Sequence, residues 1–561
     1  MSNRDLSELR NQHFDIVIIG GGITGAWLSL HCAQQGYKTA LIEKHDYASQ
    51  TSSSSSKLLH GGIRYLQQIQ FAKVRESAME RAEYLYAAPH LSQPVAFLVP
   101  TYPDFKRSKF FLNCGMMAYR LLCLGENKII SSKEQNLPKT HSLNATELNQ
   151  IYKLDGDAHT GAVVFYERHM LDSERMVLSI LQTAQKYGAQ TYNYVSATEF
   201  INENNQLKGI HAVDELSGDT FEVNAKLVIN ASGPFIDNLN TKLSNANNAP
   251  KINGFAVGSH IITRQLSEHA IALTSKHQSN AKLDRGGRHI FIIPWRGYSL
   301  IGTSYDEIDS PKENLNIQSD HVEKLLEAVN EGMPSAKLTR SDIVSGYSGL
   351  YPLNTDNIKS TVYQGSGEYQ IIDHERANGV SGIISALGAK FTTGRKISEL
   401  TMKVVEQKLA RANINKRIKL HDSDYSSLSS LIKTKTKQYK DQYSTQVIEH
   451  LIMCYGSKID DFLSSIKDNS ELSMPICNHQ PDLLGQVLWA IKHEQAVTLD
   501  DILYRRTSLG LLGIKHQELS NVAKLMAKEL QWSAEQLQQQ LDISKQGIQN
   551  TQNAINGGTI V

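Results

Sequence analysis

The feature that most constrains the fold of this chain is a glycine-rich turn between two strand-like segments near the N-terminus. An apolar run at residues 15–19 leads into Gly-Gly-Gly-Ile-Thr-Gly at residues 20–25, and a helix-like segment follows over residues 26–35. A second strand-like segment at residues 39–42 then ends in Glu43. Strand, glycine turn, helix, strand and acid in this order are typical of a βαβ unit that binds a dinucleotide.

Each part of this motif has a physical reason. Gly20 permits a tight turn, Gly22 lets the backbone approach a pyrophosphate, and Gly25 lets the helix pack closely on the strand. The helix N-terminus presents N–H groups and the positive end of its dipole to phosphates. The Glu43 carboxylate can accept hydrogen bonds from ribose hydroxyls. The motif therefore predicts an adenine dinucleotide, but it does not by itself distinguish NAD from FAD.

A serine-rich segment makes this distinction. Residues 51–66 read Thr-Ser-Ser-Ser-Ser-Ser-Lys-Leu-Leu-His-Gly-Gly-Ile-Arg-Tyr-Leu. A serine run is usually a flexible linker, but this one leads directly into a segment that is half apolar. The stretch resembles the FAD-dependent glycerol-3-phosphate dehydrogenases, members of the D-amino-acid-oxidase-like flavoprotein superfamily. The resemblance implies FAD as the cofactor, with the serine segment along the flavin and the His-Gly-Gly segment beside the substrate.

The resemblance continues in the family order along residues 14–541. It includes Asn-Ala-Ser-Gly-Pro-Phe at residues 230–235, Gly-Ser-His-Ile at residues 258–261, Gly-Ala-Lys-Phe-Thr-Thr at residues 388–393 and a C-terminal stretch at residues 493–507. Together, the glycine motif and the resemblance predict the residues that bind the cofactor: Gly20, Gly22, Gly25, Glu43, Ser52, Ser53, Ser56, Lys57, His60, Gly61, Val195, Gly233, Gly388 and Thr392.

For the substrate site, the resemblance implies Arg64, Tyr65, His260, Tyr351 and Lys390, of which Arg64, His260 and Lys390 are the expected catalytic residues. Arg64 and Lys390 offer positive charge to an anion, although Arg64 could instead form a surface salt bridge and Lys390 could be a solvated surface cation. Histidine titrates near neutral pH, so His260 can accept a hydroxyl proton while hydride leaves carbon. A lone histidine on a strand is more often structural, but the Gly-Ser-His context favours the catalytic role.

Position 351 departs from the family pattern. The family usually has an arginine in a Tyr-Ser-Gly-hydrophobic-Arg-Pro-Leu sequence, where it helps to hold the anionic end of the substrate. Residues 347–353 of this chain read Tyr-Ser-Gly-Leu-Tyr-Pro-Leu. Tyr351 can donate one hydrogen bond but carries no charge near neutral pH. The sequence therefore defines the cofactor more firmly than the substrate.

The expected fold class is α/β, with a discontinuous Rossmann-type FAD-binding domain, an antiparallel-sheet substrate domain and an all-helical C-terminal domain. We expect the FAD-binding domain at residues 14–70, 160–250 and 366–410, and the substrate domain at residues 71–159 and 251–365. The helical domain is expected at residues 420–541. Residues 544–561 are rich in Asn, Gln and Gly, and we expect them to be disordered.

The composition is that of a globular protein, with 40% hydrophobic and 20% charged residues. A net charge of +1 argues against a nucleic-acid-binding protein. The five cysteines are scattered and form no Cys-x-x-Cys pair, which argues against a disulfide framework and a structural metal site. The polar N-terminus and the lack of a long apolar run predict a cytoplasmic protein.

Residues 105–124 could place the protein on a membrane. Apolar residues recur there at helical spacing, and basic residues flank them. Such a segment can lie in a membrane interface, or it can be a helix packed on its own domain. Family members commonly sit on the membrane and pass electrons to quinone. The resemblance thus implies a quinone or other electron acceptor and peripheral contact with the inner face of the cell membrane, and it leaves a homodimer open.

Three functions remain open at this stage. The first is FAD-dependent oxidation of sn-glycerol 3-phosphate to dihydroxyacetone phosphate, with hydride passing to flavin N5. The second is a related flavoprotein oxidoreductase that acts on a different hydroxy or amine substrate, because Tyr351 replaces the family arginine. The third is a flavin-binding protein with little turnover, against which the presence of Arg64, His260 and Lys390 argues.

The expected role of Arg64 can be tested by substitution. Arg64→Ala should keep the flavin but lose substrate turnover, because removal of a charged hydrogen-bond partner of a ligand costs about 2–5 kcal/mol. Steady-state kinetics should show kcat/KM reduced by more than about tenfold. A variant within twofold of the wild type would remove Arg64 from the site.

Overall fold

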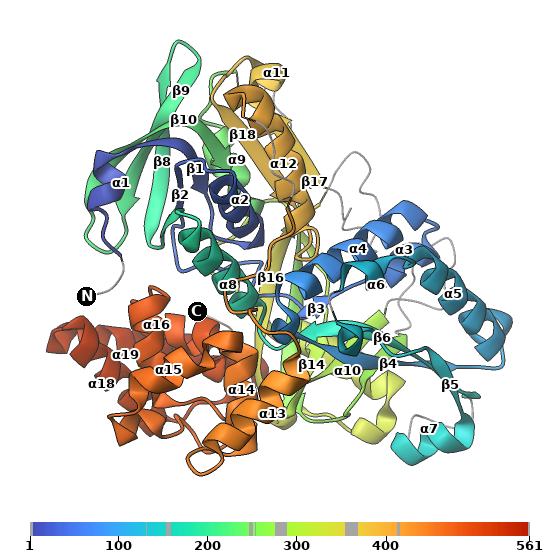
Figure 1. Cartoon of the computed structure of the whole chain (residues 1–561). Coiled ribbons are helices and arrows are strands. Elements are labelled where there is room, and N and C mark those ends of the chain that lie inside the picture. The colour runs from blue at the N-terminus through green and yellow to red at the C-terminus, as the bar shows by residue number, and fades with distance from the viewer. Residues whose placement is uncertain are drawn as a thin grey trace.

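The computed structural model describes residues 4–130, 132–152, 159–245, 251–252, 254–274, 289–353, 369–411 and 416–558, except for the Arg64 side chain. Within these residues the chain forms two large sheets and a group of C-terminal helices. Figure 1 shows the first sheet at the top of the view and the C-terminal helices at the lower left.

The first sheet is built from parallel strands around β1. Its order is β17 (Tyr369–Asp373), β18 (Ile383–Gly388), β10 (Thr220–Asn230), β1 (His13–Ile19), β2 (Thr39–Ile42) and β7 (Gln190–Tyr192), and the hairpin β8 (Val195–Glu203) and β9 (Gln206–Asp214) continues from β10. Helices α2 (Ile23–Gln34), α8 (Ser173–Lys186) and α12 (Gly394–Leu409) pack together over one face. Helices that cover parallel strands confirm the predicted Rossmann-type domain.

The second sheet is antiparallel apart from the β4–β12 pair. Its order is β15 (Asp306–Ile308), β11 (Phe255–Arg264), β14 (Tyr298–Gly302), β13 (His289–Trp295), β12 (Ala270–Thr274), β4 (Ser92–Thr101), β6 (Gly161–Met170) and β3 (Leu58–Leu59), with β16 (Ile343–Pro352) paired to β11 and β5 (His141–Asn144) to β6. Helix α10 (Ser319–Gly332) packs on this sheet through buried apolar side chains. This sheet confirms the predicted second domain.

Strand β6 corrects one predicted boundary. Residues 160–170 were expected in the FAD-binding domain, but β6 pairs with β4 along ten positions, from Ser92–Met170 to Thr101–Gly161. Phe97 and Phe165 lie opposite each other on these strands, with ring centroids 5.3 Å apart. The β-branched and aromatic residues of β6 identify a strand but carry no information about its partner, so the sequence could not assign it to a sheet.

The C-terminal domain is helical, as predicted. It contains α13 (Leu428–Tyr439), α14 (Thr445–Tyr455), α15 (Ile459–Ile466), α16 (Leu484–His493), the π-helix η10 (Asp501–Arg506), α17 (Leu509–Leu512), α18 (His516–Leu530) and α19 (Ala534–Ile555). Two apolar clusters hold these helices together.

The prediction that residues 544–561 are disordered is wrong for most of this segment, because α19 runs to Ile555. Ala554 and Ile555 are buried in the core of the second sheet. The Arg340 side chain donates a hydrogen bond to the Ile555 carbonyl at 2.7 Å. This carbonyl is one of those at a helix C-terminus that have no hydrogen-bond partner within the helix. Most residues of this segment are polar because they face solvent, and its overall composition gave no sign that Ala554 and Ile555 are buried.

This anchor generates a stability prediction. Ile555→Ala should lower the free energy of unfolding by about 2–4 kcal/mol, because it leaves a cavity in a closed core. Ile543→Ala is a matched control, since Ile543 lies on the same helix but is 50% exposed, and it should change stability by less than about 0.5 kcal/mol. Chemical denaturation measures both. Equal effects of the two variants would contradict the anchoring of α19.

Candidate functional site

A cavity of about 690 Å³ lies between the two sheets. It extends from the carboxyl ends of β1 and β2 to strands β11 and β16 of the second sheet. Most of the residues predicted from the sequence line it: Gly20, Gly22, Glu43, Ser52, Ser56, His60, Tyr65, Val195, Gly233, His260, Tyr351, Gly388, Lys390 and Thr392. The cavity therefore joins the predicted cofactor residues and the predicted substrate residues in one space.

The glycine turn forms one end of this cavity. Gly20 has a φ of +109°, and a Cβ there would lie 2.6 Å from the carbonyl oxygen of Ala231. A Cβ on Gly25 would overlap the carbonyl oxygen of Gly20, so α2 can approach β1 only without a side chain. Gly22 caps the N-terminus of α2 and lines the cavity, as does Gly20. This cradle fits the pyrophosphate of a dinucleotide.

Glu43 lies at the end of β2 beside the cradle. Its carboxylate accepts hydrogen bonds from the N–H groups of Gly21 at 2.6 Å and His45 at 2.9 Å. Burial raises the pKa of Glu43, even though these two N–H groups act to lower it. A carboxylate has lone pairs beyond the two used here, so Glu43 can still accept a hydrogen bond from a ribose hydroxyl.

The serine segment packs between α2 and β16. The Ile23 N–H donates to the Ser52 hydroxyl at 3.0 Å, and the Thr51 hydroxyl donates to the Leu350 carbonyl at 2.5 Å. A Cβ on Gly349 would lie only 2.6 Å from the Cβ of Ser54. Small residues are needed on both sides of this contact, which explains a small residue at position 54. Ser53 turns away from the cavity and donates to the Gln50 carbonyl at 2.8 Å.

Two further predicted cofactor residues hold the framework and do not line the cavity. Lys57 is fully buried, and its ammonium group lies 2.9 Å from both carboxylate oxygens of Glu174. The Gly61 N–H donates to Glu167 at 2.9 Å, and a Cβ on Gly61 would overlap the Tyr119 hydroxyl. A buried carboxylate thus holds the Lys57 ammonium group and the Gly61 N–H, and contact of these two residues with the cofactor stays a prediction.

His260 projects from β11 into the other end of the cavity. Its Nε2 lies 2.9 Å from the Ser56 hydroxyl, and its ring stacks on Tyr347 with centroids 5.1 Å apart. The Tyr347 hydroxyl donates to the Ser55 carbonyl at 2.6 Å. Burial raises the pKa of the Tyr347 phenol well above its usual value, so this donor stays neutral. The Ser56 and Tyr347 contacts fix the plane of the His260 ring.

Tyr347 was not among the site residues predicted from the sequence, although the alternation of side-chain direction along a strand indicates it. Residues of one strand that are two apart share a face, and Gly349 and Tyr351 on β16 both line the cavity. Tyr347 continues that face. Tyr347 pairs with His260 of β11 in the register of the two strands.

Lys390 and Tyr65 meet at the cavity wall. The Lys390 ammonium group lies 3.6 Å from the centroid of the Tyr65 ring, a cation–π contact. Arg64 precedes Tyr65 in α3 (Ile63–Gln67), but its side chain is outside the described part of the structure. Lys390, His260 and Tyr351 thus surround one end of the cavity with a cation, an imidazole and a phenol. This set can bind an anion and accept a proton.

Two family models match the chain. Residues 15–397 match the FAD dependent oxidoreductase family, and residues 414–537 match the C-terminal domain of alpha-glycerophosphate oxidase. The second model covers the helical domain described above up to the first turn of α19.

Similar proteins span nearly the whole chain. A glycerol-3-phosphate dehydrogenase of Synechocystis is 33% identical, and the alignment covers 96% of this chain and 97% of the relative. An aerobic glycerol-3-phosphate dehydrogenase of Staphylococcus haemolyticus is 30% identical over 94% of this chain and 92% of its own length. The crystal structure of the Bacillus halodurans glycerol-3-phosphate dehydrogenase with FAD has the same fold, with a TM-score of 0.76, 24% identity and coverage of 98% and 97% of the two chains.

The glycine cradle generates a prediction about cofactor retention. Gly22→Val should weaken FAD binding by at least about tenfold, because a side chain would separate the phosphates from N–H donors that contribute about 1.5–3 kcal/mol each. Gly547→Val is the control, since nothing lies within 4 Å of the Cβ position of this glycine in α19. The ratio of flavin absorbance to protein in the purified variants measures retention. Wild-type retention by Gly22→Val would exclude this turn as the phosphate site.

Proposed function

This chain belongs to the FAD-dependent glycerol-3-phosphate dehydrogenase family, and on that premise we propose that it oxidises sn-glycerol 3-phosphate to dihydroxyacetone phosphate. One observation carries the proposal: the cavity that begins at the glycine cradle ends at His260 and Lys390. A cofactor and a small anionic alcohol can therefore meet in a single space.

Each residue at the substrate end of the cavity would have a separate role in this oxidation. FAD supplies the hydride acceptor when it is bound. The Ser56 hydroxyl lines the cavity and lies 2.9 Å from His260 Nε2, so the substrate proton can reach this nitrogen directly or through Ser56. Tyr347 keeps the imidazole in place by stacking. Lys390 offers its charge to the phosphate, and Arg64 is the second cation that the family resemblance implies.

Tyr351 supports a second candidate function. It lines the cavity from β16, and its ring would lie 3.5 Å from a Cβ on Gly258 of β11. The position where the family has a bidentate cation therefore holds a phenol in this chain. A phenol donates one hydrogen bond and cannot replace an arginine on a phosphate without loss. The alternative is oxidation of a different hydroxy or amine substrate in the same cavity.

We propose quinone as the electron acceptor because of a second cavity. It has a volume of about 360 Å³ and shares His60, Ile63 and Phe291 with the first cavity. Most of its other lining residues are apolar, among them Leu66, Phe97, Val99, Phe111, Leu112, Met116 and Phe165. An apolar space of this size beside the reaction cavity suits a quinone ring.

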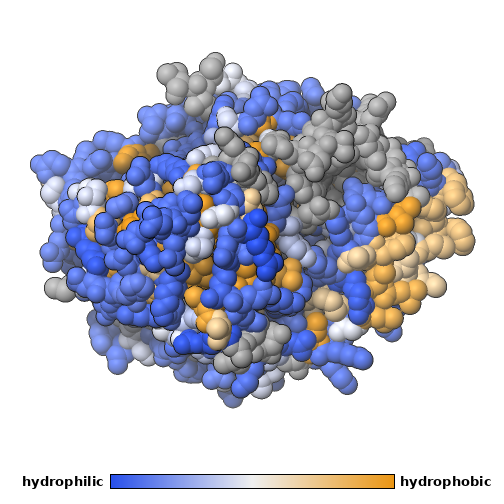
Figure 2. Space-filling view, turned by 90° about the horizontal axis from the view of Figure 1, so that it is seen from above, coloured by the Kyte–Doolittle hydropathy of each residue, from blue (hydrophilic) through white to orange (hydrophobic). Residues whose placement is uncertain are grey.

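Exposed apolar side chains are concentrated in the segment that lines part of this second cavity. Seven of the twelve large apolar side chains that are exposed in the described residues fall within residues 69–124: Ile69, Phe71, Phe105, Phe110, Met117, Leu121 and Leu124. Helix α5 (Lys109–Leu122) contributes three of them while burying Leu112 and Met116. Figure 2 shows an apolar area at the right of the view, the side on which α5 lies in Figure 1.

This surface supports peripheral membrane contact. Basic residues flank it, and a basic amphipathic helix can lie in the interface of an anionic bilayer. No helix among the described residues is both long and apolar enough to cross a membrane. A place on the inner face of the cell membrane, and likewise a homodimer, stay predictions.

The substrate assignment is tested at position 351. Tyr351→Arg should lower the KM for glycerol 3-phosphate by about tenfold, because a hydrogen bond to a charged group contributes about 1.5–3 kcal/mol. Tyr351→Gln is the matched control, since it removes the phenol without adding charge, and it should not lower KM. Steady-state kinetics on phosphorylated and unphosphorylated alcohols measure both variants.

The opposite result would favour the second candidate. If the true ligand is not a phosphate, a cation in this cavity should impair turnover of that ligand, and the two variants should both be slower than the wild type. A wild-type preference for an uncharged alcohol or an amine would overturn the assignment to glycerol 3-phosphate.

The membrane surface is tested by binding to vesicles. Phe110 and Met117 are 71% and 68% exposed, and the double variant Phe110→Glu/Met117→Glu should bind anionic phospholipid vesicles at least about tenfold more weakly. Met474→Glu/Ile543→Glu changes two comparably exposed residues elsewhere and should bind as the wild type does. Equal co-sedimentation of both double variants with vesicles would remove α5 from the contact.

A further inference from the structure

The loop at residues 43–50, which follows β2, has two faces. Glu43, Lys44, His45, Ala48, Ser49 and Gln50 line the large cavity. Asp46 and Tyr47 do not line it, and both side chains are buried on the other side of the loop. On that side lies the C-terminal domain, so one short segment contacts both the cofactor space and the helical domain.

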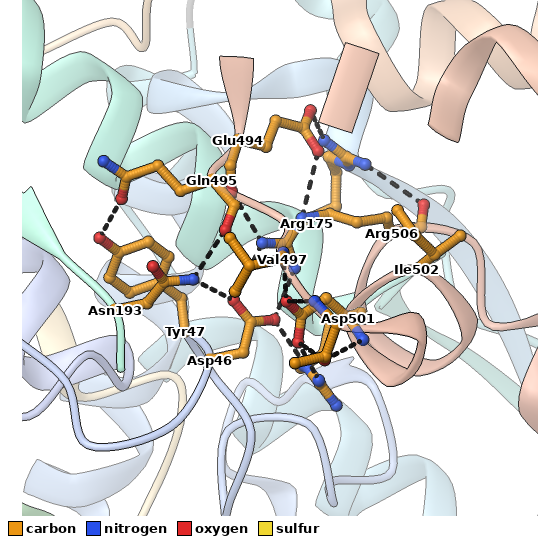
Figure 3. Close-up of polar contacts among 12 residues, drawn as sticks. Asp46, Tyr47, Arg175, Asn193, Glu494, Gln495, Val497, Asp501, Ile502 and Arg506 are labelled. Atoms are coloured by element: carbon orange, nitrogen blue, oxygen red, sulfur yellow. Dashed lines mark hydrogen bonds and ion pairs between the residues drawn. The ribbon is translucent and has the colours of Figure 1, made fainter. Parts of the chain in front are cut away.

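The Asp46 carboxylate is held by two arginines of the C-terminal domain. Arg506 donates to it from Nη1 at 2.7 Å and from Nη2 at 3.0 Å, and Arg505 Nε lies 2.5 Å away. Asn193 adds a hydrogen bond at 3.1 Å. Figure 3 shows Arg506 and Asn193 directed at this carboxylate. Although burial acts to raise the pKa of Asp46, the two guanidinium groups lower it to about 2.

The arginines are themselves fixed within the C-terminal domain. Both lie in the π-helix η10, a rare form that often marks functional positions. Arg505 Nη2 donates to Asp501 at 2.7 Å, and Arg506 Nη2 donates to the Glu494 carbonyl at 2.8 Å. The Glu494 carboxylate pairs with Arg175 of α8. Every charge in this cluster therefore has a defined partner, as buried charges require.

Tyr47 carries the contact on to the glycine turn. Its hydroxyl donates to Gln495 of the C-terminal domain at 2.6 Å. Its ring packs on Gly21, where a Cβ would lie 2.8 Å from Tyr47 Cδ1. The next residue, Ala48, donates its N–H to the Gly21 carbonyl at 3.1 Å. The C-terminal domain thus touches the phosphate cradle through one intervening side chain.

We propose that Asp46, Arg505 and Arg506 are positioning residues for FAD, which make the docked C-terminal domain a part of the cofactor site. None of the three lines the cavity, and they act by fixing the loop at residues 43–50 against the glycine turn. The inference rests on the FAD dependence of the family. It implies that the helical domain, more than 400 residues away in the sequence, sets how tightly FAD is retained.

The experiment measures FAD affinity separately from stability. Full-length apo protein is titrated with FAD, flavin fluorescence gives the dissociation constant, and thermal unfolding of the apo form is recorded in parallel. Asp46→Asn, which is isosteric, and Arg505→Met, which keeps an apolar stem, should each raise the dissociation constant by about tenfold or more, the change that a lost 1.4 kcal/mol produces.

The control is a second buried ion pair that docks the same domain elsewhere. Arg296, in the turn between β13 and β14, lies 2.7 Å from Asp482 and donates to the Thr507 carbonyl at 2.7 Å, but it does not line the cavity. Arg296→Met should lower the unfolding temperature of the apo form and leave the FAD dissociation constant within about twofold of the wild type. An equal rise in all three variants would contradict the proposal, because it would reflect loss of docking in general.

A milder variant keeps the test decisive if Asp46→Asn or Arg505→Met fails to fold. Tyr47→Phe removes only the hydrogen bond to Gln495, and it should raise the dissociation constant about threefold while the apo form still unfolds cooperatively. An unchanged dissociation constant in Tyr47→Phe and in any folded variant of Asp46 or Arg505 would overturn the proposal. A wild-type chain that binds no FAD in the same titration would instead contradict the assignment of the cofactor.

Discussion

The structure depends on a backbone approach at the carboxyl end of β1 that leaves no room for side chains. Gly20 lies against the Ala231 carbonyl, and Gly25 lies against the carbonyl of Gly20 itself. This contact brings the start of α2 and the end of β10 together around one point. The N-terminus of a helix therefore faces open space at the place where the parallel strands end, which is where α/β sheets bind ligands.

The second sheet supplies the other wall of this space. Its strands β11 and β16 place His260, Tyr347 and Tyr351 on one face. The serine segment lies between that face and α2, and it is bonded to both through Ser52 and Thr51. The cradle and the reactive end of the cavity are thus positioned by the same short segment. A displacement of residues 51–56 would alter cofactor and substrate contacts together.

The sequence predicted those parts of the molecule whose geometry is local. The βαβ unit, the strand at residues 39–42 and the helical C-terminal domain follow from periodicity and glycine placement. The residues that the resemblance identified in short motifs mostly line one cavity. The motifs at residues 20–25, 230–235 and 388–393 lie where β1, β10 and β18 end, whereas His260 and Tyr351 lie within β11 and β16.

Long-range partners were not predictable in the same way. Lys57 belongs to a serine segment that lines the cavity, yet its ammonium group forms an ion pair with the buried Glu174 carboxylate of α8. The partner of β6 and the anchor of α19 depend on residues far away in the chain. The contact between Asp46 and Arg506 joins residues 460 positions apart. Pattern and spacing within one segment contain no information about such pairings.

The most direct measurement is anaerobic reduction of the protein-bound flavin by sn-glycerol 3-phosphate, followed by loss of the visible flavin absorbance. We expect rapid and complete bleaching by sn-glycerol 3-phosphate, and none by glycerol at the same concentration. Glycerol lacks the phosphate that Lys390 and Arg64 are expected to bind, while it offers the same secondary alcohol to His260. Bleaching only by an uncharged alcohol or an amine, or no bleaching by any of these compounds, would contradict the proposed oxidation of sn-glycerol 3-phosphate.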